Sequence, residues 1–488
     1  MPAALLTRPG GRERLPAAED RRLLPANRGG VAGWIPTALT VVAVATGSLL
    51  VVAPAPSYDP WACLLWGREV AELRLSTAEG PAFKPLPVAV SALLSPLGGA
   101  APWLWVLIVR VSALTALLLA FRLATRLSGG HRAAGALAAA GVALSGSFLA
   151  QAAAGQSEPL LIALILAGAC LARSGRFGAV AICAAACALI RVETWPFLIV
   201  LAAWAWRARP GLRGAVVAIT ALVPLAWFLP ELLGSGDLLR SGTRARVPNP
   251  GQPALAPIPA LASLTGALSL TPWPLWVGVA ALAAGATRDP IRHARALTPA
   301  AIGGAWLVLV AAMAQAGFSG EARYAVPGSA LIAISGGIGL VALARRAVSH
   351  SGAVAGATAL LIAGLAASHS PSLLSIPAAQ RHQWRLAADL SAAIGAAGGR
   401  DALLACGTPY VGRLRGPLLA HHLNVAKHHV EPDLPPRGPG VVFRSRMTRT
   451  SAAVPETPAG FAPVAANRSW TIHAACRDTT TTPPIRVP

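Results

Sequence analysis

Two ionisable residues, Asp59 and Lys84, mark the two ends of a polar segment in a chain that is otherwise strongly apolar. A carboxylate held between Tyr58 and Pro60 suits a general base for an incoming hydroxyl group. Asp before Pro is also a common start of a helix, and both roles are compatible. Lys84 is one of only two lysines in the chain. The proline that follows it favours an extended backbone, from which this compact cation could reach a phosphate.

Further charged and aromatic residues lie in several separate loops. We expect these loops at the same membrane surface as Asp59 and Lys84. Arg191 and Arg323 could hold the same phosphate with paired hydrogen bonds, although Arg323 beside Tyr324 could equally be an interfacial anchor. Charges at membrane depth are costly and are usually paired or functional. Arg110, inside an apolar span, could pair with Glu158 or extend toward the surface. We expect one cavity at the outer leaflet to be lined by Tyr58, Trp61, Arg68, Glu158, Glu193 and Glu321.

The elements that must position these residues are membrane helices. The chain is 55% hydrophobic and only 12% charged, whereas ordinary soluble domains carry about 25% charged residues. A span needs roughly 20 mostly apolar residues. The sequence therefore predicts an all-α polytopic membrane bundle of about eleven transmembrane helices, near 32–54, 101–121, 133–151, 158–173, 177–191, 194–207, 214–233, 257–287, 297–317, 325–344 and 352–369.

The distribution of arginine predicts the topology. Alternate connecting segments, beginning with the N-terminus, hold most of the arginines that precede residue 370 and few acids, while the other set is nearly balanced. The positive-inside rule then places the N-terminus in the cytoplasm and the loop 54–100 outside the cell membrane, with the C-terminal tail outside as well. A net charge of +22 would suggest nucleic acid in a soluble protein. Here it is a topology signal, and we expect no nucleic-acid partner.

Three parts follow along the chain: a disordered cytoplasmic leader (1–30), a transmembrane domain (31–369) that contains the outer loop 54–100, and an extracytoplasmic α/β tail domain (370–488). The tail has helical spacing over 380–398. Short buried strands are expected at Ala402–Cys406, Gly440–Phe443 and Trp470–Cys476. Outside the cytoplasm a disulfide between Cys406 and Cys476 is chemically permitted, and spacing alone leaves it open.

Other motifs give little support to metal or nucleotide chemistry. No Cys/His spacing resembles a zinc site. The histidines of the tail lack acidic or Cys partners at ligand spacing, so we expect a solvated face at His421, His422, His428 and His429. The run Gly336-Gly337-Ile338-Gly339 lies within a span and is typical of helix packing. No nucleotide-binding fingerprint is present.

Taken together, these residues resemble the C-type (GT-C) membrane glycosyltransferases, which include protein O-mannosyltransferases, aminoarabinose transferases and actinobacterial cell-wall glycosyltransferases. Tyr58-Asp59-Pro60-Trp61 matches the family's acidic residue after the first span. The stretch Trp61–Leu75 is similar to its amphipathic surface helix, and Lys84-Pro85-Leu86-Pro87 to its Lys-Pro element. The composition, rich in alanine and arginine, also resembles that of a high-GC actinobacterium.

The resemblance implies an inverting transfer of a hexosyl or pentosyl group. The donor would be a polyprenyl-phosphate sugar, and the acceptor a hydroxyl of a cell-envelope glycan, lipid or protein. Asp59 would be the base, and Lys84 with Arg191 or Arg323 would hold the donor phosphate. Pro60 and Phe83 stand where many relatives carry acids, so we expect no cofactor and a dispensable divalent metal. The alternatives are a transporter or flippase of lipid-linked sugars and a non-catalytic membrane scaffold.

Overall fold

The computed structural model describes residues 34–287, 289–348, 350–432 and 438–476. It divides into two units, residues 1–44 and 45–488. In the first unit, the described part is the start of helix α1 (Ile35–Val51), whose apolar side chains are mostly exposed. The expected leader, 1–30, lies outside the described residues. The three-part domain division remains a prediction.

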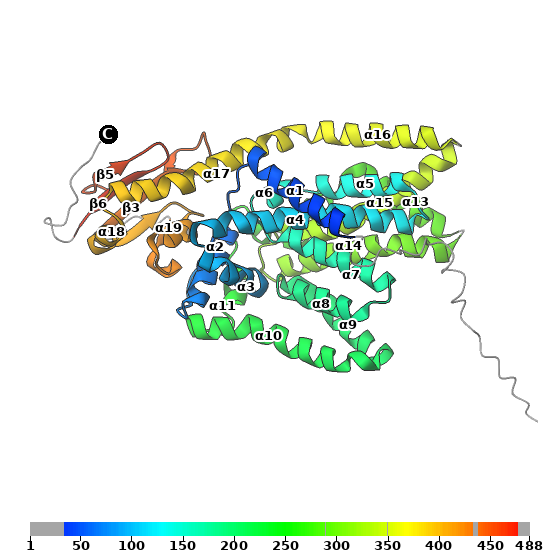
Figure 1. The fold of residues 1–488 in the computed structure, drawn as a ribbon, viewed down its shortest axis with the longest axis horizontal. Helices are drawn as coiled ribbons and strands as arrows, with labels where there is room; N and C mark the ends of the chain where they lie inside the picture. Colours follow the sequence, from blue (N-terminus) through cyan, green and yellow to red (C-terminus); the bar gives the residue numbers. More distant parts are fainter. Residues whose placement is uncertain (1–33, 288, 349, 433–437, 477–488) are drawn as a thin grey trace, which may run out of the picture. The chain divides into compact units, whose positions relative to one another are not determined.

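Helices make up most of the second unit (Figure 1). The polar segment after α1 forms α2 (Tyr58–Ala71) and α3 (Pro85–Leu94), and η2 (Ser95–Ala100) follows. The remaining helices as far as the C-terminal part are α4 (Ala101–Leu127), α5 (Arg132–Leu144), α6 (Phe148–Ala153), α7 (Glu158–Arg173), α8 (Phe177–Ala188), η3 (Val192–Thr194), α9 (Trp195–Ala208), η4 (Pro210–Leu212), α10 (Arg213–Ser235), α11 (Arg240–Ala245), η5 (Pro253–Leu255), α12 (Pro259–Leu268), α13 (Trp273–Ala286), α14 (Pro290–Gln315), η6 (Ala322–Ala325), α15 (Val326–Ala347) and α16 (Ser351–Ser368).

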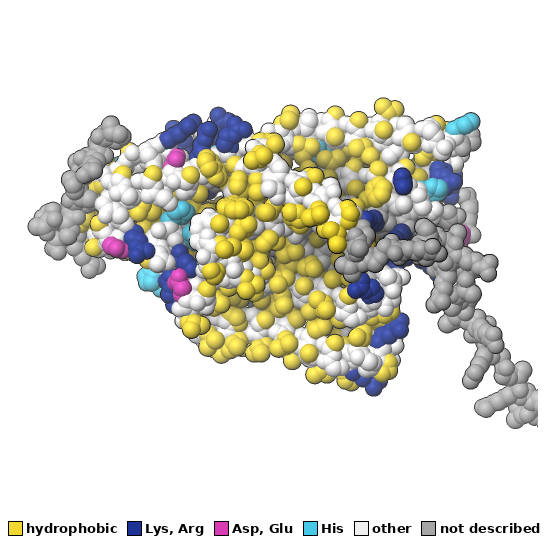
Figure 2. Space-filling model, in the orientation of Figure 1, with side chains coloured by type: hydrophobic (Ala, Val, Ile, Leu, Met, Phe, Trp, Pro, Cys, Tyr) yellow, Lys and Arg dark blue, Asp and Glu magenta, His cyan; other side chains and the backbone are white. Residues whose placement is uncertain are grey.

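The chain is a multi-pass membrane protein. Among the described residues, five helical segments are long and apolar enough to cross a bilayer, or six if the bent pair α12 and α13 forms one span. Each expected span coincides with one or two helices, but several of these are shorter than a bilayer requires, so the count of eleven spans stays a prediction. Figure 2 shows apolar side chains covering the face over α8 and α10.

Helix α15 lies at the centre of the helical part, and its glycines allow the close packing. A Cβ added at Gly339 would lie 1.8 Å from the carbonyl oxygen of Gly278 on α13. A Cβ at Gly337 would lie 2.7 Å from the backbone nitrogen of Ala138 on α5. Only a residue without a side chain fits so close to a neighbouring backbone. The expectation that this glycine run packs helices is confirmed.

The C-terminal part combines helices with one six-stranded sheet. The central strand β3 (Gly440–Arg446) pairs in parallel with β1 (Thr408–Val411) and antiparallel with β6 (Thr471–Ala475). The strand order is β2-β1-β3-β6-β5, with β4 beside β3. The other elements are α17 (Ser370–Ala396), α18 (Arg400–Cys406), α19 (Gly416–Leu423), η7 (Lys427–His429), β2 (Glu431–Pro432), β4 (Ala453–Val454) and β5 (Ala462–Ala466). A small α/β domain is therefore confirmed.

One expected strand is wrong. The run Ala402–Cys406 belongs to helix α18, and the strand follows it as β1. Short apolar runs fit a buried strand or a buried helix equally well. The expected strands at 440–443 and 470–476 are confirmed by β3 and β6. Cys406 and Cys476 form a disulfide, which joins the end of α18 to the chain just after β6.

Helix α2 is an inner helix rather than an exposed surface helix. Ten of its fourteen residues are buried, because α3 and α19 both pack against it. Trp61 contacts the rings of His421 and His422 at centroid distances of 5.2 Å and 5.7 Å. These two histidines are therefore partly buried, contrary to expectation, whereas His428 and His429 are exposed. The C-terminal part thus holds the helix that carries Asp59.

Candidate active site

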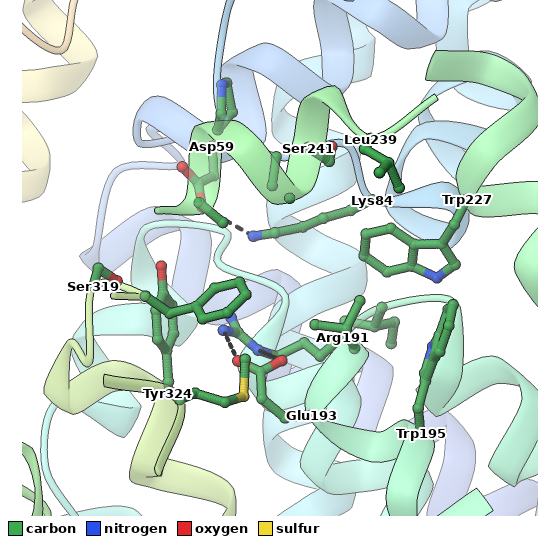
Figure 3. A pocket seen from close by; sticks show the side chains of 18 of the residues that line it. Asp59, Lys84, Arg191, Glu193, Trp195, Trp227, Leu239, Ser241, Ser319 and Tyr324 are labelled. Carbon is green, nitrogen blue, oxygen red and sulfur yellow. Dashed lines mark hydrogen bonds and ion pairs between the residues drawn. The ribbon is translucent and has the colours of Figure 1, made fainter. Parts of the chain in front are cut away.

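A cavity of about 350 Å³ brings together five of the residues singled out from the sequence. Its polar side is lined by Asp59, Lys84, Arg191, Glu193 and Arg323. They come from α2, the start of α3, the loop before η3, η3 itself and η6. Segments far apart in the sequence therefore supply one group of charges (Figure 3).

Asp59 is the point where two cations meet. Lys84 Nζ lies 2.9 Å from Asp59 Oδ2, and Arg323 Nη1 lies 3.2 Å from the same oxygen. Asp59 lies in the first turn of α2, whose N-cap is Ser57. The Asp59 carboxylate forms ion pairs with both cations. The N-terminus of a helix also favours a negative charge. Lys84 precedes Pro85 in an extended conformation (φ −131°, ψ 102°), as expected from the sequence.

The charges around Asp59 keep it ionised. Burial alone would raise the pKa of this carboxyl, but the positive charges of Lys84 and Arg323 outweigh burial and hold its pKa well below the usual range. Burial lowers the pKa of Lys84, and the negative charge of Asp59 more than compensates, so that the pKa is raised. Both groups are therefore charged at neutral pH.

Arg191 is held by two carboxylates of its own. Its Nη1 lies 2.9 Å from Glu158 Oε1, and its Nη2 lies 2.6 Å from Glu193 Oε1. Its Nε donates a further hydrogen bond of 3.2 Å to Glu193 Oε2, and its guanidinium lies 3.9 Å from the centre of the Tyr324 ring. Arg191 therefore has two carboxylate partners. Arg323 also has two, Asp59 and Glu321, whereas Lys84 pairs with Asp59 alone among the described residues.

Helix α11 fixes the segment that carries Lys84. The Phe83 backbone nitrogen donates to Ser241 Oγ at 2.7 Å, and Ser241 in turn hydrogen-bonds Glu231. Arg240 donates to the carbonyl oxygens of Pro81 and Gly80 at 2.7 Å and 2.9 Å. Sequence reasoning missed these three residues. Glu231 carried a usable signal, because it is a carboxylate within the apolar helix α10, where charges are rare.

The other side of the cavity is apolar. It is lined by side chains from α9, α10, α11 and α14 and from nearby loops, including Trp195, Trp227, Phe228, Leu239 and Met313. Figure 3 shows Trp195 and Trp227 together on the side away from Asp59. A charged group and an apolar chain could therefore occupy the same cavity at once.

The remaining residues expected to line the cavity do not line it. Trp61 packs on the tail histidines, and Arg68 donates to the His421 carbonyl oxygen at 2.8 Å. Glu158 is fully buried behind Arg191, and Glu321 forms an ion pair with Arg323. Tyr58 precedes Asp59 at the start of α2, and burial raises the pKa of its phenol to about 12.

Arg110 takes neither of the two roles considered for it. Its guanidinium donates to Ser48 Oγ at 3.1 Å and to the carbonyl oxygens of Ala53 and Ala153 at 3.3 Å and 3.4 Å. Backbone carbonyl groups therefore compensate its burial. It braces the chain just before α2 and takes no part in the cavity.

The carboxylates of the site are paired with cationic side chains. Within the described residues, no group of three or more His, Cys, Asp or Glu side chains is arranged to hold a metal ion. Asp59, Glu158 and Glu193 each face a cationic side chain instead. The dispensability of a divalent metal remains a prediction.

Fold and cavity together define a polytopic membrane protein with a buried polar cluster and a C-terminal α/β domain. Two solved structures share the fold: ArnT from Cupriavidus metallidurans bound to undecaprenyl phosphate, and the same protein in the apo state. The TM-scores are 0.54 and 0.55, at 16% and 15% sequence identity, and each match covers 93% of this chain and 100% of the other. No family model and no curated protein matches the sequence.

Proposed function

We propose that the protein transfers a sugar from a polyprenyl-phosphate donor to an acceptor hydroxyl outside the cytoplasm, with inversion at the anomeric carbon. The observation that carries this proposal is the pair Lys84 and Arg323, which converge on Asp59 at the edge of an apolar cavity. The fold of ArnT, one structure of which holds undecaprenyl phosphate, supports the same substrate class.

The donor phosphate binds to Lys84 and Arg323. Both cations contact Asp59, Arg323 also pairs with Glu321, and the Arg323 side chain is 25% exposed. A phosphate that enters the cavity therefore replaces part of their contact with Asp59. Arg191 has a carboxylate on each side, so its charge is already compensated and its role is to orient the site. During transfer, the two cations stabilise the negative charge that develops on the leaving phosphate.

Asp59 is the general base. In the empty site its low pKa makes it a weak base, because two cations stabilise the carboxylate. Donor binding draws those cations toward the phosphate and brings a negative charge nearby, and both changes raise the pKa of Asp59. The acceptor oxygen attacks the anomeric carbon, its proton passes to Asp59, and the bond from that carbon to the phosphate oxygen breaks.

The apolar side of the cavity holds the first units of the prenyl chain. Trp195, Trp227 and Phe228 lie beside the polar cluster on helices that face lipid elsewhere. The chain extends from there between helices into the bilayer. This arrangement requires the cavity to open at the outer leaflet, in agreement with the topology that the arginine distribution predicts.

Binding of undecaprenyl phosphate to the purified protein tests the donor site. Lys84→Ala and Arg323→Gln each weaken binding at least tenfold, because each removes a cation that would contact the phosphate. Arg191→Gln instead lowers the unfolding temperature, because it leaves two buried carboxylates without their cation. Tryptophan fluorescence and thermal unfolding in detergent measure the two effects.

The matched control is Arg176→Gln, which removes an exposed arginine far from Lys84 in the sequence. An unchanged affinity in both Lys84→Ala and Arg323→Gln would contradict the phosphate role. Transport of the lipid-linked sugar across liposomes without a new glycosidic bond would identify a flippase instead.

A further inference from the structure

A second cavity, of about 660 Å³, lies in the C-terminal part between α17 and the sheet. Its volume falls within the range of ligand sites. Its wall carries six arginines from four separate pieces of chain: α17, β3, the loop after β3 and the turn between β5 and β6. They are Arg381, Arg385, Arg444, Arg446, Arg449 and Arg468. We call this the arginine cavity.

The arginine cavity carries an excess of positive charge, although the carboxylate of Asp389 accepts a hydrogen bond from Ser469 in its wall. No carboxylate belongs to its wall, and within the described residues none of its six arginines forms an ion pair. Figure 2 shows basic side chains gathered over α17 and the neighbouring strands. Like charges that are held together repel one another, so an anion that enters would remove an unfavourable interaction.

The wall is also structurally organised. Arg444 is anchored by hydrogen bonds to the carbonyl oxygens of Pro455 and Ala453, at 2.8 Å and 3.3 Å. His382 Nε2 lies 3.2 Å from the Arg446 carbonyl oxygen and ties α17 to β3. Burial and nearby arginines, Arg415 and Arg449 among them, lower the pKa of His382, so it holds this position as a neutral ring.

Polar groups suited to sugar hydroxyls stand among the arginines. The wall includes Ser445, Ser469, Thr471 and Asn467. Of these, Ser469 and Asn467 already form hydrogen bonds with Asp389. The Ser445 hydroxyl is buried and has no hydrogen-bond partner among the described residues.

The position of the arginine cavity favours a glycan over lipid headgroups. Helix α16 is the last apolar helix of spanning length within the described chain, and α17 starts at Ser370. Arg381 lies eleven residues further on, about 16 Å along a helix. A headgroup layer is only about 5–8 Å thick. A helix that continues from α16 along the bilayer normal would carry these arginines beyond that layer.

We propose that the arginine cavity binds an anionic glycan chain, through phosphodiester or carboxylate groups on the arginines and through hydroxyls on the serine and threonine side chains. Guanidinium groups match both anions with paired hydrogen bonds. Glycan binding in this cavity does not depend on the proposed function. Its use as a subsite for the acceptor rests on the proposed function, because a glycan held here would present its hydroxyl end to the nearby membrane domain.

The test uses the full chain in phosphatidylcholine nanodiscs. Three soluble probes are titrated by calorimetry: poly(glycerol phosphate), polygalacturonate and neutral dextran. The test variant is Arg381→Gln/Arg446→Gln/Arg449→Gln, whose three side chains are exposed and form no hydrogen bond with the described residues. The control variant, Arg173→Gln/Arg176→Gln/Arg207→Gln, removes the same charge from exposed positions outside the C-terminal part.

Wild type and control bind at least one anionic probe, the test variant binds it at least tenfold more weakly, and dextran binds to none of them. The anionic probe that binds more tightly shows whether the cavity prefers phosphodiester or carboxylate groups. Equal binding by test variant and wild type, or equal losses in test and control variants, overturns the proposal. So does a difference that vanishes in phosphatidylglycerol nanodiscs, because lipid headgroups would then fill the cavity. Asp59→Asn leaves probe binding unchanged, so this result is independent of the transferase test.

Discussion

At the scale of residues, the proposed reaction depends on one carboxylate that contacts two cations. Asp59 has Lys84 at 2.9 Å and Arg323 at 3.2 Å, and all three line the same cavity. The neighbouring set of Arg191, Glu158 and Glu193 has the opposite balance, with two acids around one cation. The first group can exchange its partner for a phosphate, while the second is better suited to hold the site in place.

The low pKa of Asp59 predicts a pH dependence of stability. The folded pKa lies below the ordinary value of 3.8, so the ion pair stabilises the fold above about pH 4, and this contribution is lost as pH falls through the folded pKa. Wild type should therefore unfold at a higher temperature than Asp59→Asn by a constant margin between pH 5 and pH 8. The margin should shrink below pH 4.

Thermal unfolding of both proteins across this range measures the effect. Asp401→Asn is the matched control, because its side chain is 88% exposed and pairs only with Arg400 among the described residues. A margin that grows on acidification would show that Asp59 is not stabilised as a carboxylate.

At the scale of elements, the sequence predicted the helices better than the contacts between them. Apolar runs locate membrane helices because lipid demands them, and Pro85 sets the backbone of Lys84 locally. The contribution of α11 could not be predicted, because Ser241 and Arg240 reach Phe83 and Pro81 across about 160 residues. The inner position of α2 was equally hidden, since it depends on α19 from the far end of the chain.

The disulfide gives a prediction at this scale. Cys406 and Cys476 close a loop with a sequence separation of 70 residues, and the chain-entropy model gives a stabilisation of about 4 kcal/mol for such a loop. Cys406→Ser/Cys476→Ser should lower the unfolding temperature of the C-terminal part and increase its proteolysis. Limited proteolysis of the variant against wild type measures this change.

Cys170→Ser/Cys183→Ser is the control, because both thiols are free and lie in the helical part. Equal protease sensitivity of the disulfide variant and wild type would mean that the bridge adds nothing to the fold.

At the scale of the whole molecule, the proposed reaction requires the cavity to face away from the cytoplasm. The arginine distribution predicts that the cavity faces away from the cytoplasm, and cysteine labelling can test this orientation. Leu73, just after α2, is 96% exposed, and Arg176, between α7 and α8, is also exposed. On intact cells, a membrane-impermeant maleimide should label Leu73→Cys and spare Arg176→Cys until the cells are opened. The reverse pattern would place the cavity on the cytoplasmic side.

The central claim is that Asp59 acts as the base in sugar transfer, and turnover by Asp59→Asn tests it most directly. The variant protein, reconstituted with undecaprenyl-phosphate sugars and a cell-envelope acceptor fraction, is compared with wild type and Asp401→Asn. We predict a loss of transfer of about 10²- to 10⁴-fold, with undecaprenyl phosphate bound at least as tightly as by wild type, because a negative charge beside the phosphate is gone. Near-normal transfer by Asp59→Asn would contradict the account.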